Sequence, residues 1–255
     1  EQFGKMDIIL KPLERIGDFA LFFINTVLSV KEIHKTFGEI LRQIAVIGYD
    51  SLVIVGGSST FVGLVSAVLI SFQIKDFVPA NVIGMGIWKG VITELAPVLT
   101  ALVVAGRVGG GLASQIGTMR ITEQIDALEV MGINPYRFIV LPRIMGGIIS
   151  IPLLTAIATF ISIFAALMFA TYVYSMPYND LVSGMRMSYN NQDLIVGGVK
   201  AITFATIISF ISCYEGFRTE GGAIGVGLSA MRAVVYSAVL ILAADFIISL
   251  YFYGR

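Results

Sequence analysis

Residues 93–143 read TELAPVLTALVVAGRVGGGLASQIGTMRITEQIDALEVMGINPYRFIVLPR, which runs from the end of one apolar segment through a more polar stretch to the start of the next apolar segment. The rest of the chain is mostly apolar, because 56% of its 255 residues are hydrophobic and only 13% are charged. An average soluble domain has about 25% charged residues. With a mean hydropathy of +0.87, the chain has more apolar surface than a globule of this size can bury. The composition therefore predicts a protein of the lipid bilayer.

Several functional classes are excluded by composition and by missing motifs. The 17 basic and 17 acidic residues balance, so we expect no nucleic-acid partner. A single cysteine, Cys213, and a single histidine, His34, leave no disulfide and no metal site. The glycines between 221 and 227 lack the lysine of a phosphate-binding loop, and the sequence has no hydrolase motif. We therefore expect a non-enzymatic chain that binds no cofactor itself.

Apolar segments of sufficient length predict the membrane topology. A transmembrane helix needs about 20 mostly apolar residues. The shorter stretch Ile16–Val30 carries Asp18, Asn25 and Ser29 on one helical stripe, which predicts a helix in the membrane interface; a sixth, short span is the alternative. The expected fold is all-α and polytopic, with this N-terminal interfacial helix plus five transmembrane helices. The five spans are expected at 50–74, 84–106, 144–172, 193–214 and 233–253.

The basic residues predict the orientation. They gather before residue 50, between 107 and 143, and at Arg218 and Arg232. Because basic residues are retained on the cytoplasmic side, we expect a cytoplasmic N-terminus and a periplasmic C-terminus. Short loops and the lack of a plastid-type leader in the sequence favour a bacterial inner membrane over a chloroplast envelope.

A short amphipathic helix is predicted at about 121–131, on the cytoplasmic side between the second and third spans. Thr122 is positioned to cap its start, and Gly132 followed by Asn134 and Pro135 should end it. Such a short helix cannot bury its apolar stripe within its own loop. It either docks on a partner protein or folds back on other cytoplasmic loops of this chain. The apolar positions are Ile121, Ile125 and Leu128, and the acidic positions on another face are Glu123, Asp126 and Glu129.

Glu94, Lys200 and Asp245 are ionisable and lie well inside predicted spans, where each costs about 2.5–3.5 kcal/mol on insertion scales. We expect Lys200 and Asp245 to face the protein interior and to pair. Glu94 lies three residues before Pro97, which deprives a backbone carbonyl of its helical donor and can kink the helix. Glu94 is either a polar group in a substrate cavity or a carboxyl satisfied by a nearby hydroxyl such as that of Thr93.

The elements ELxPVLT, AGRxG, GTMR, EQIDAL and NPxR, all within residues 94–137, closely resemble the signature of the MlaE permease family. Members of this family are the membrane subunits of MCE-type lipid ABC transporters. The likeness covers most of the chain and implies one permease domain over residues 1–255. Residues 1–49 would form its cytoplasmic and interfacial helices, and residues 50–255 its transmembrane bundle.

The resemblance implies a homodimer that moves phospholipid. Its partners would be a cytoplasmic ATPase, which binds ATP and Mg²⁺, and a periplasmic MCE-domain protein. The family's coupling helix falls on the EQIDAL segment, and its lipid cavity lies at the dimer interface. Two departures are Thr93, where many members have arginine, and Ser114-Gln115, where many have Ala-Glu. The resemblance assigns Glu123, Gln124, Asp126, Leu128 and Glu129 to ATPase coupling, and Glu94, Thr93, Pro97 and Phe77 to the cavity.

Two other functional classes remain open from the residues alone. Glu94, Lys200 and Asp245 could form a relay in an ion-coupled carrier or a channel. Transport that persists without any ATPase would favour this alternative. An intramembrane enzyme is the third interpretation, and the missing nucleophile and base argue against it.

Overall fold

The computed structural model describes residues 17–30, 36–74 and 78–254, and within these ranges it consists of helices and short connections without strands. The first helix is Gly17–Ser29. The later α-helices are α2 Phe37–Tyr49, α3 Leu52–Ile74, α4 Ala80–Gly90, α5 Ala96–Val104, α6 Gly110–Ile121, α7 Gln124–Val130, α8 Leu141–Val173, α9 Tyr178–Met187, α10 Asn191–Phe217 and α11 Gly222–Tyr253. The π-helical segments are η2 Val91–Leu95, η3 Ala105–Gly109 and η4 Tyr136–Val140.

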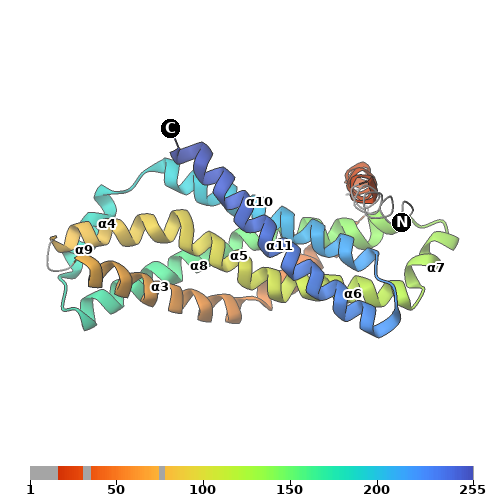
Figure 1. Ribbon diagram of the computed structural model, residues 1–255, viewed down its shortest axis with the longest axis horizontal. Coiled ribbons are helices and arrows are strands. Elements are labelled where there is room, and N and C mark those ends of the chain that lie inside the picture. Colours follow the sequence, from red (N-terminus) through yellow and green to blue (C-terminus); the bar gives the residue numbers. More distant parts are fainter. Residues whose placement is uncertain (1–16, 31–35, 75–77, 255) are drawn as a thin grey trace, which may run out of the picture.

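Among the described residues, five helical stretches are long and apolar enough to cross a membrane. They run side by side and form an elongated bundle (Figure 1), with α7 at one end and α9 at the other. The predicted all-α polytopic fold with five spans is therefore confirmed. The five stretches are Leu52–Phe72, Ala80–Ile121, Tyr136–Val173, Asn191–Phe217 and Gly222–Tyr253.

The second span is much longer than predicted. It is helical over 42 residues, about 63 Å at 1.5 Å per residue, and it continues through a glycine-rich stretch that was expected to be a loop. Some of these glycines lie at packing contacts: a Cβ on Gly109 would lie 3.0 Å from Ser212 Oγ, and one on Gly110 would lie 3.3 Å from Val234 Cγ2. The sequence is less apolar here, and α6 packs against protein through Leu112, Ala113, Ile116 and Gly117. The third and fifth spans likewise begin earlier than predicted, at 136 and 222.

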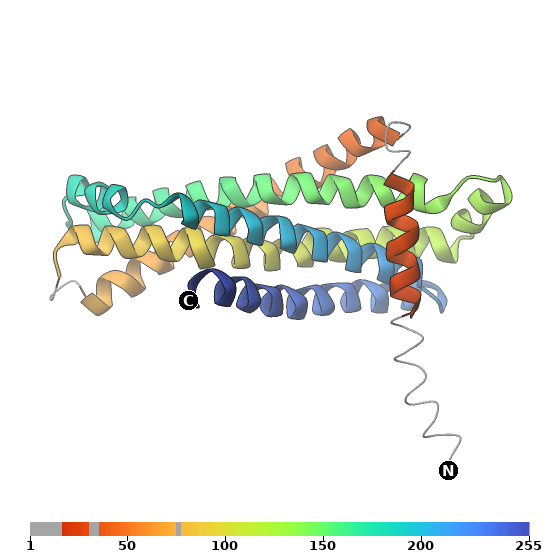
Figure 2. The ribbon, with the colours of Figure 1, turned by 90° about the horizontal axis from the view of Figure 1, so that it is seen from above.

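The N-terminal helix Gly17–Ser29 lies crosswise to the five long helices, near the end of the bundle that carries α7 (Figure 2). Phe22 is buried against the bundle, where its ring packs edge-on against Tyr214 and Tyr136. Leu21 and Ile24 remain exposed on the outer side. A short helix with this crosswise position and exposed apolar residues fits the predicted interfacial helix better than a sixth span.

Close backbone contacts hold the bundle together at the α9 end. A Cβ on Gly84 of α4 would lie 2.1 Å from the Leu181 carbonyl oxygen of α9, and a Cβ on Gly184 of α9 would lie 1.8 Å from that of Asn81. Neither position can hold a larger residue without moving the backbone. The pair of glycines therefore fixes α9 against the start of the second span, which is the way small residues pack helices in lipid.

Candidate functional site

Three charged side chains from three spans meet inside the bundle, and we call them the Lys200 cluster. Lys200 Nζ on α10 lies 2.8 Å from Glu94 Oε2 on η2 and 2.7 Å from Asp245 Oδ1 on α11. The Lys200 side chain has no exposed surface. Because an unpaired buried ion costs several kcal/mol, this cluster ties α10 to the second and fifth spans. The predicted pairing of Lys200 with Asp245 is confirmed, and Glu94 joins the pair.

The third acceptor of Lys200 is a backbone carbonyl. Nζ donates to the Thr93 carbonyl oxygen at 2.9 Å. Proline has no N–H, so Pro97 cannot donate to the carbonyl four residues earlier, which is that of Thr93. The chain is π-helical over Val91–Leu95, directly before this proline. The carbonyl that Pro97 leaves without a helical donor is therefore satisfied by the Lys200 ammonium.

A hydroxyl also satisfies Glu94, but it is not the predicted one. Ser249 Oγ of α11 donates to Glu94 Oε1 at 3.0 Å. The Thr93 hydroxyl instead donates to the carbonyl oxygen of Lys89 at 2.8 Å, so the expected Thr93 partner is wrong. The Glu94 side chain is 43% exposed. The Glu94 carboxylate thus contacts the buried Lys200 ammonium and is also partly exposed at the surface of this chain.

The polar helix between the second and third spans starts later than predicted. Thr122 is the C-cap of α6, and its hydroxyl donates to the Thr118 carbonyl. Glu123, with a φ of 59°, makes the turn before α7 begins. The predicted N-cap role of Thr122 is therefore wrong, because α6 extends to this point.

The predicted end of the α7 helix is confirmed. Gly132 has a φ of 74°, and its N–H donates to the Glu129 carbonyl while the Ile133 N–H donates to that of Leu128. This pair of bonds is the Schellman arrangement, in which a glycine reverses the chain and satisfies the last carbonyls. The chain turns sharply here and returns to the bundle through Asn134 and Pro135.

The apolar side of α7 folds back on this chain. Ile125 is fully buried in a cluster that includes Ile116 of α6 and Ile139 of η4, and Leu128 packs against the same cluster. Arg120 of α6 pairs with Asp126 of α7. Of the two alternatives open from the sequence, folding back is the one the structure shows for the apolar stripe. It also places Asp126 and Leu128 in contacts within the chain.

The opposite side of α7 has no cover in the described chain. Val130 is 89% exposed and Met131 is 64% exposed. Glu123, Gln124 and Glu129 are exposed as well. The outward face of α7 is therefore acidic with an apolar tip, and it projects from the end of the bundle (Figure 1).

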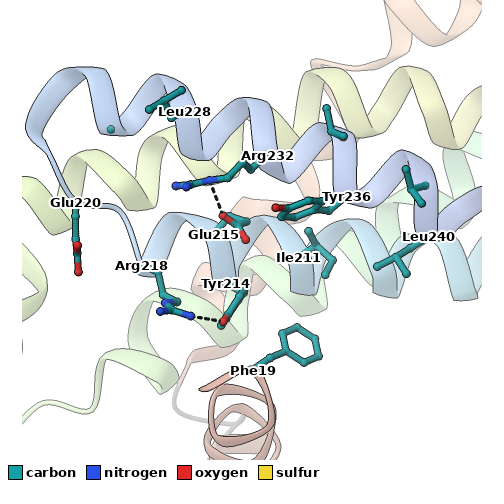
Figure 3. Close-up of a pocket in the computed structure, with 13 residues that line it drawn as sticks. Phe19, Ile211, Tyr214, Glu215, Arg218, Glu220, Leu228, Arg232, Tyr236 and Leu240 are labelled. Atoms are coloured by element: carbon teal, nitrogen blue, oxygen red, sulfur yellow. Dashed lines mark hydrogen bonds and ion pairs between the residues drawn. The ribbon is translucent and has the colours of Figure 1, made fainter. Parts of the chain in front are cut away.

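A pocket of about 800 Å³ opens between α10, α11 and the N-terminal helix, close to the α7 end. Figure 3 shows its side chains. Arg232 Nε lies 3.1 Å from Glu215 Oε2, and Arg218 donates to the Tyr214 hydroxyl at 2.7 Å. The hydrogen bond to Tyr214 raises the pKa of Arg218 above its ordinary value; desolvation opposes this shift, and the nearby charges of Asp18 and Glu215 add to it. No pattern in the sequence indicates this pocket.

The sequence profile of the MlaE permease family matches residues 40–251. A probable ABC transporter permease protein of Rickettsia prowazekii is 34% identical over 244 residues, which cover 96% of this chain and 94% of the relative. The chain belongs to the MlaE permease family. A second relative, a probable ABC transporter permease protein of Synechocystis sp., is 34% identical over 82% of this chain and 80% of its own length.

A plant protein is also similar to this MlaE-family chain. The chloroplastic protein TRIGALACTOSYLDIACYLGLYCEROL 1 of Arabidopsis thaliana is 35% identical over 216 residues, which cover 84% of this chain and 61% of the plant protein. The family and these names identify a multi-pass transporter permease subunit.

The other predicted site residues of this MlaE-family permease are placed as follows. Pro97 is buried, so it acts on the site through the Thr93 carbonyl and does not line an open surface of the chain. Phe77 lies outside the described residues. Gln115, at one of the two departures from the family pattern, is exposed on α6. Ser249 and the Thr93 carbonyl were missed, because a serine in an apolar span gives no signal and the helix register is not in the sequence.

Proposed function

We propose that this permease is the membrane subunit of an ABC transporter that moves phospholipids between the bacterial inner membrane and a periplasmic MCE-domain protein. A separate cytoplasmic ATPase binds ATP and Mg²⁺ and drives the cycle. Family membership and the relatives' names support the permease part of this proposal. The Arabidopsis relative is named after trigalactosyldiacylglycerol, a glycerolipid, which supports a lipid cargo.

The observation that carries the proposal is the construction of α7. Its inner side is locked to the bundle through Ile125 and through the Arg120–Asp126 pair, and its outer face is exposed. A helix fixed on one side and open on the other can accept a push from a partner and transmit it. An acidic face with the apolar tip Val130 and Met131 suits a basic groove with an apolar floor on the ATPase.

The contacts around α7 suggest how motion reaches the membrane. Displacing α7 must also move α6 and η4, because Ile125 is buried between them. Motion of α6 must move α10, since a Cβ on Gly216 would lie 2.8 Å from the Ala113 carbonyl oxygen. Well-packed contacts of this kind shift as rigid bodies. In the proposed homodimer, this shift narrows the cavity at which Glu94 is exposed and releases the lipid towards the MCE protein.

ATP-dependent lipid transfer tests the proposal directly. The permease, its ATPase and its MCE partner would be reconstituted in liposomes that contain a fluorescent phospholipid, and transfer to the MCE protein would be followed over time. We expect transfer only with ATP and Mg²⁺, and none with an ATPase whose phosphate-binding lysine is replaced. Transfer at the same rate with the defective ATPase would refute the proposal.

The buried charges favour one alternative, an ion-coupled carrier. Two carboxylates and one ammonium lie in contact within the spans, as they do in proton relays. However, Lys200 is already saturated by three acceptors, since it also bonds the Thr93 carbonyl. We therefore assign the cluster a structural role. Uptake driven by an ion gradient in liposomes that contain the permease alone would support the carrier instead.

A further inference from the structure

The last turns of α11, residues 245–253, are attached to the bundle differently from the rest of this helix, and we call them the outer segment. Among the five described spans, the one formed by α11 is the least buried. Its buried residues lie between Gly225 and Ile241, and none of its described residues after Ile241 is buried. Within the described chain, no hydrophobic cluster includes a residue of the outer segment. Apolar packing therefore does not hold the outer segment in place.

Polar contacts hold the outer segment instead. Asp245, Ser249 and Tyr253 are spaced four residues apart, so they share one face of α11. Each of them bonds to a residue of α10 or η2, and we call the set the polar ladder. Its three contacts are Asp245–Lys200, Ser249–Glu94 and Tyr253–Asp193.

The outermost contact joins the end of α11 to the start of α10, which lie side by side near the C-terminus (Figure 1). The Tyr253 hydroxyl donates to Asp193 Oδ1 at 3.0 Å. Asp193 is only 4% exposed, and its Oδ2 has no hydrogen-bond partner within the described chain. A buried carboxylate needs donors, so Asp193 depends on this hydroxyl while water is excluded. Once water reaches Asp193, the hydroxyl can be replaced at little net cost.

The neighbours of the outer segment are fixed more firmly than the segment itself. A Cβ on Gly197 of α10 would lie 3.0 Å from the Ile92 carbonyl oxygen of η2, so these two elements are in close backbone contact. The inner half of α11 is also fixed, because a Cβ on Gly110 would lie 3.3 Å from Val234 Cγ2. If the ladder parts, the outer segment is therefore the part that moves.

A small tilt is enough to part the ladder. From Ile241, the last buried residue, to Tyr253 the helix measures about 18 Å, so a tilt of about 10° moves Tyr253 by about 3 Å and Asp245 by only about 1 Å. The first displacement takes the Tyr253 hydroxyl out of hydrogen-bond range of Asp193. Helices that curve gently, with a radius of about 60–100 Å, bend by this much over such a length. The movement therefore requires no break in α11.

We propose that the outer segment of α11 is a gate, latched by Tyr253 and Asp193, that opens the Glu94 site towards the α9 end of the bundle. In the closed state, Ser249 covers one carboxylate oxygen of Glu94. In the open state, Tyr253 and Ser249 leave their partners, water reaches both carboxylates, and the contact between Asp245 and its partner remains as the pivot. The gate deepens the proposed function and rests on it for the cargo, because a phospholipid that passes Glu94 leaves through this opening.

The position of the ladder suits a reversible contact better than a permanent brace. Tyr253 is 45% exposed and lies at the end of its span, where water is available. Glu94 is 43% exposed. Hydrogen bonds that border water can exchange partners, whereas the backbone contact between Gly84 and α9 leaves no space for movement. The bundle thus has a fixed side at α9 and a movable side at α11.

Spin labels test whether the outer segment moves. Leu194→Cys on α10 and Leu250→Cys on α11 place thiols at exposed positions, and the native Cys213 is buried. The distance between the labels is measured by dipolar electron paramagnetic resonance on the full chain in nanodiscs. Tyr253→Phe removes only the latch hydroxyl, and the loss of a hydrogen bond to a carboxylate should raise the open population about tenfold. We expect a population whose distance is longer by about 3 Å.

The matched control is Tyr251→Phe, which removes the same hydroxyl two residues away. Tyr251 is 70% exposed and has no hydrogen-bond partner within the described chain, so the distances should equal those of the chain with both tyrosines. With both tyrosines present, the longer distance should also appear while the partner ATPase hydrolyses ATP. Equal distances in Tyr253→Phe and Tyr251→Phe, together with no change during ATP hydrolysis, would overturn the proposal.

A reversible cross-link tests the role of the gate in transport. Asp193→Cys with Tyr253→Cys, joined by a bismethanethiosulfonate whose spacer matches the two lost side chains, replaces the latch by a covalent link. In liposomes with the ATPase and the MCE protein, lipid transfer should stop on cross-linking and resume after reduction with dithiothreitol. The reagent should not change transfer by either single-cysteine variant. Undiminished transfer by the fully cross-linked chain would overturn the proposal.

The two experiments separate failure of the gate from failure of the proposed function. The spin-label comparison of the tyrosine variants requires no ATPase, no MCE protein and no transported lipid. A longer distance in Tyr253→Phe without any ATP-driven transfer would support the gate and refute the proposed function. ATP-driven transfer with a label distance that never changes would refute the gate alone.

Discussion

The Lys200 cluster and α7 place ionisable residues in opposite ways. In the cluster, the ammonium is fully buried and meets three acceptors from the second and fifth spans. At α7, the ion pair between Asp126 and Arg120 is about half exposed, and the residues Glu123 and Glu129 are exposed. Charges that are turned towards each other hold helices together, whereas charges that are turned outwards are available to a partner. The Lys200 cluster therefore maintains the bundle, whereas α7 is the part that we propose binds the ATPase.

The largest loss of stability should follow from breaking the Lys200 cluster. Lys200→Ala leaves Glu94 and Asp245 without their cation, and removing one partner of a buried ion pair costs about 3–5 kcal/mol. Asp245→Ala should also destabilise, and the double variant should lose less than the sum of the two, by about 0.5–3 kcal/mol. Thermal unfolding in detergent measures all three variants. Additive losses would mean that the two residues are not coupled.

A smaller loss should follow from separating α6 from α10 near α7. In Gly216→Ala the new Cβ would meet the Ala113 carbonyl oxygen at 2.8 Å and Ile116 Cβ at 2.9 Å, so the helices must move apart, at about 1–3 kcal/mol. Gly198→Ala on the same helix is the control, because nothing lies within 4 Å of the added Cβ. We expect this control to be neutral or slightly stabilising. If both variants unfold at the same temperature, the α6–α10 contact is looser than described.

A still smaller effect is expected from the pair that links α7 to α6. Arg120→Gln removes the partner of Asp126, and because both side chains are partly exposed the loss of stability should be about 0.2–1 kcal/mol. Hydrogen exchange of residues 123–131 should nevertheless rise, since α7 loses one of its attachments. Arg186→Gln on α9, at the other end of the bundle, should leave this exchange unchanged. Exchange that stays slow in Arg120→Gln would show that Ile125 alone fixes α7.

The smallest change in stability, together with a functional loss, should come from the tip of α7. Met131 is 64% exposed, so Met131→Asp should alter stability by no more than about 0.5 kcal/mol and yet weaken binding of the ATPase at least about tenfold. Met187→Asp is the matched control, because Met187 is 69% exposed on α9. Affinity measured by biolayer interferometry with the purified ATPase decides. Equal affinities of the two variants would remove α7 from the interface.

How much the sequence could predict differs between the two regions. An isolated Lys200 and an isolated Asp245 in apolar spans predict a pair, because neither can stay unpaired in lipid. Glu94 and the Thr93 carbonyl join this pair because of the rotation of the second span about its own axis. The π-helical segment Val91–Leu95 sets that rotation. No local pattern in the sequence reports this rotation.

The helix boundaries near α7 were predicted less well, for a different reason. Hydropathy detects helices that face lipid, whereas the end of η3 and α6 pack against α10 and α11 at Gly109 and Gly110. For the same reason, Thr122 was expected at the start of α7, whereas in the structure this residue ends α6. The stop at Gly132 was predicted correctly, because a glycine followed by Asn-Pro is a local signal that needs no tertiary contact.

The side of the membrane on which α7 lies is the most direct test of the account. Val130→Cys and Met187→Cys place thiols at the two ends of the bundle, where both side chains are exposed, and the native Cys213 is buried. A membrane-impermeant maleimide should label Val130→Cys only in inside-out vesicles and Met187→Cys only in spheroplasts. Labelling of Val130→Cys in spheroplasts would put α7 outside the reach of a cytoplasmic ATPase and would contradict the proposed function.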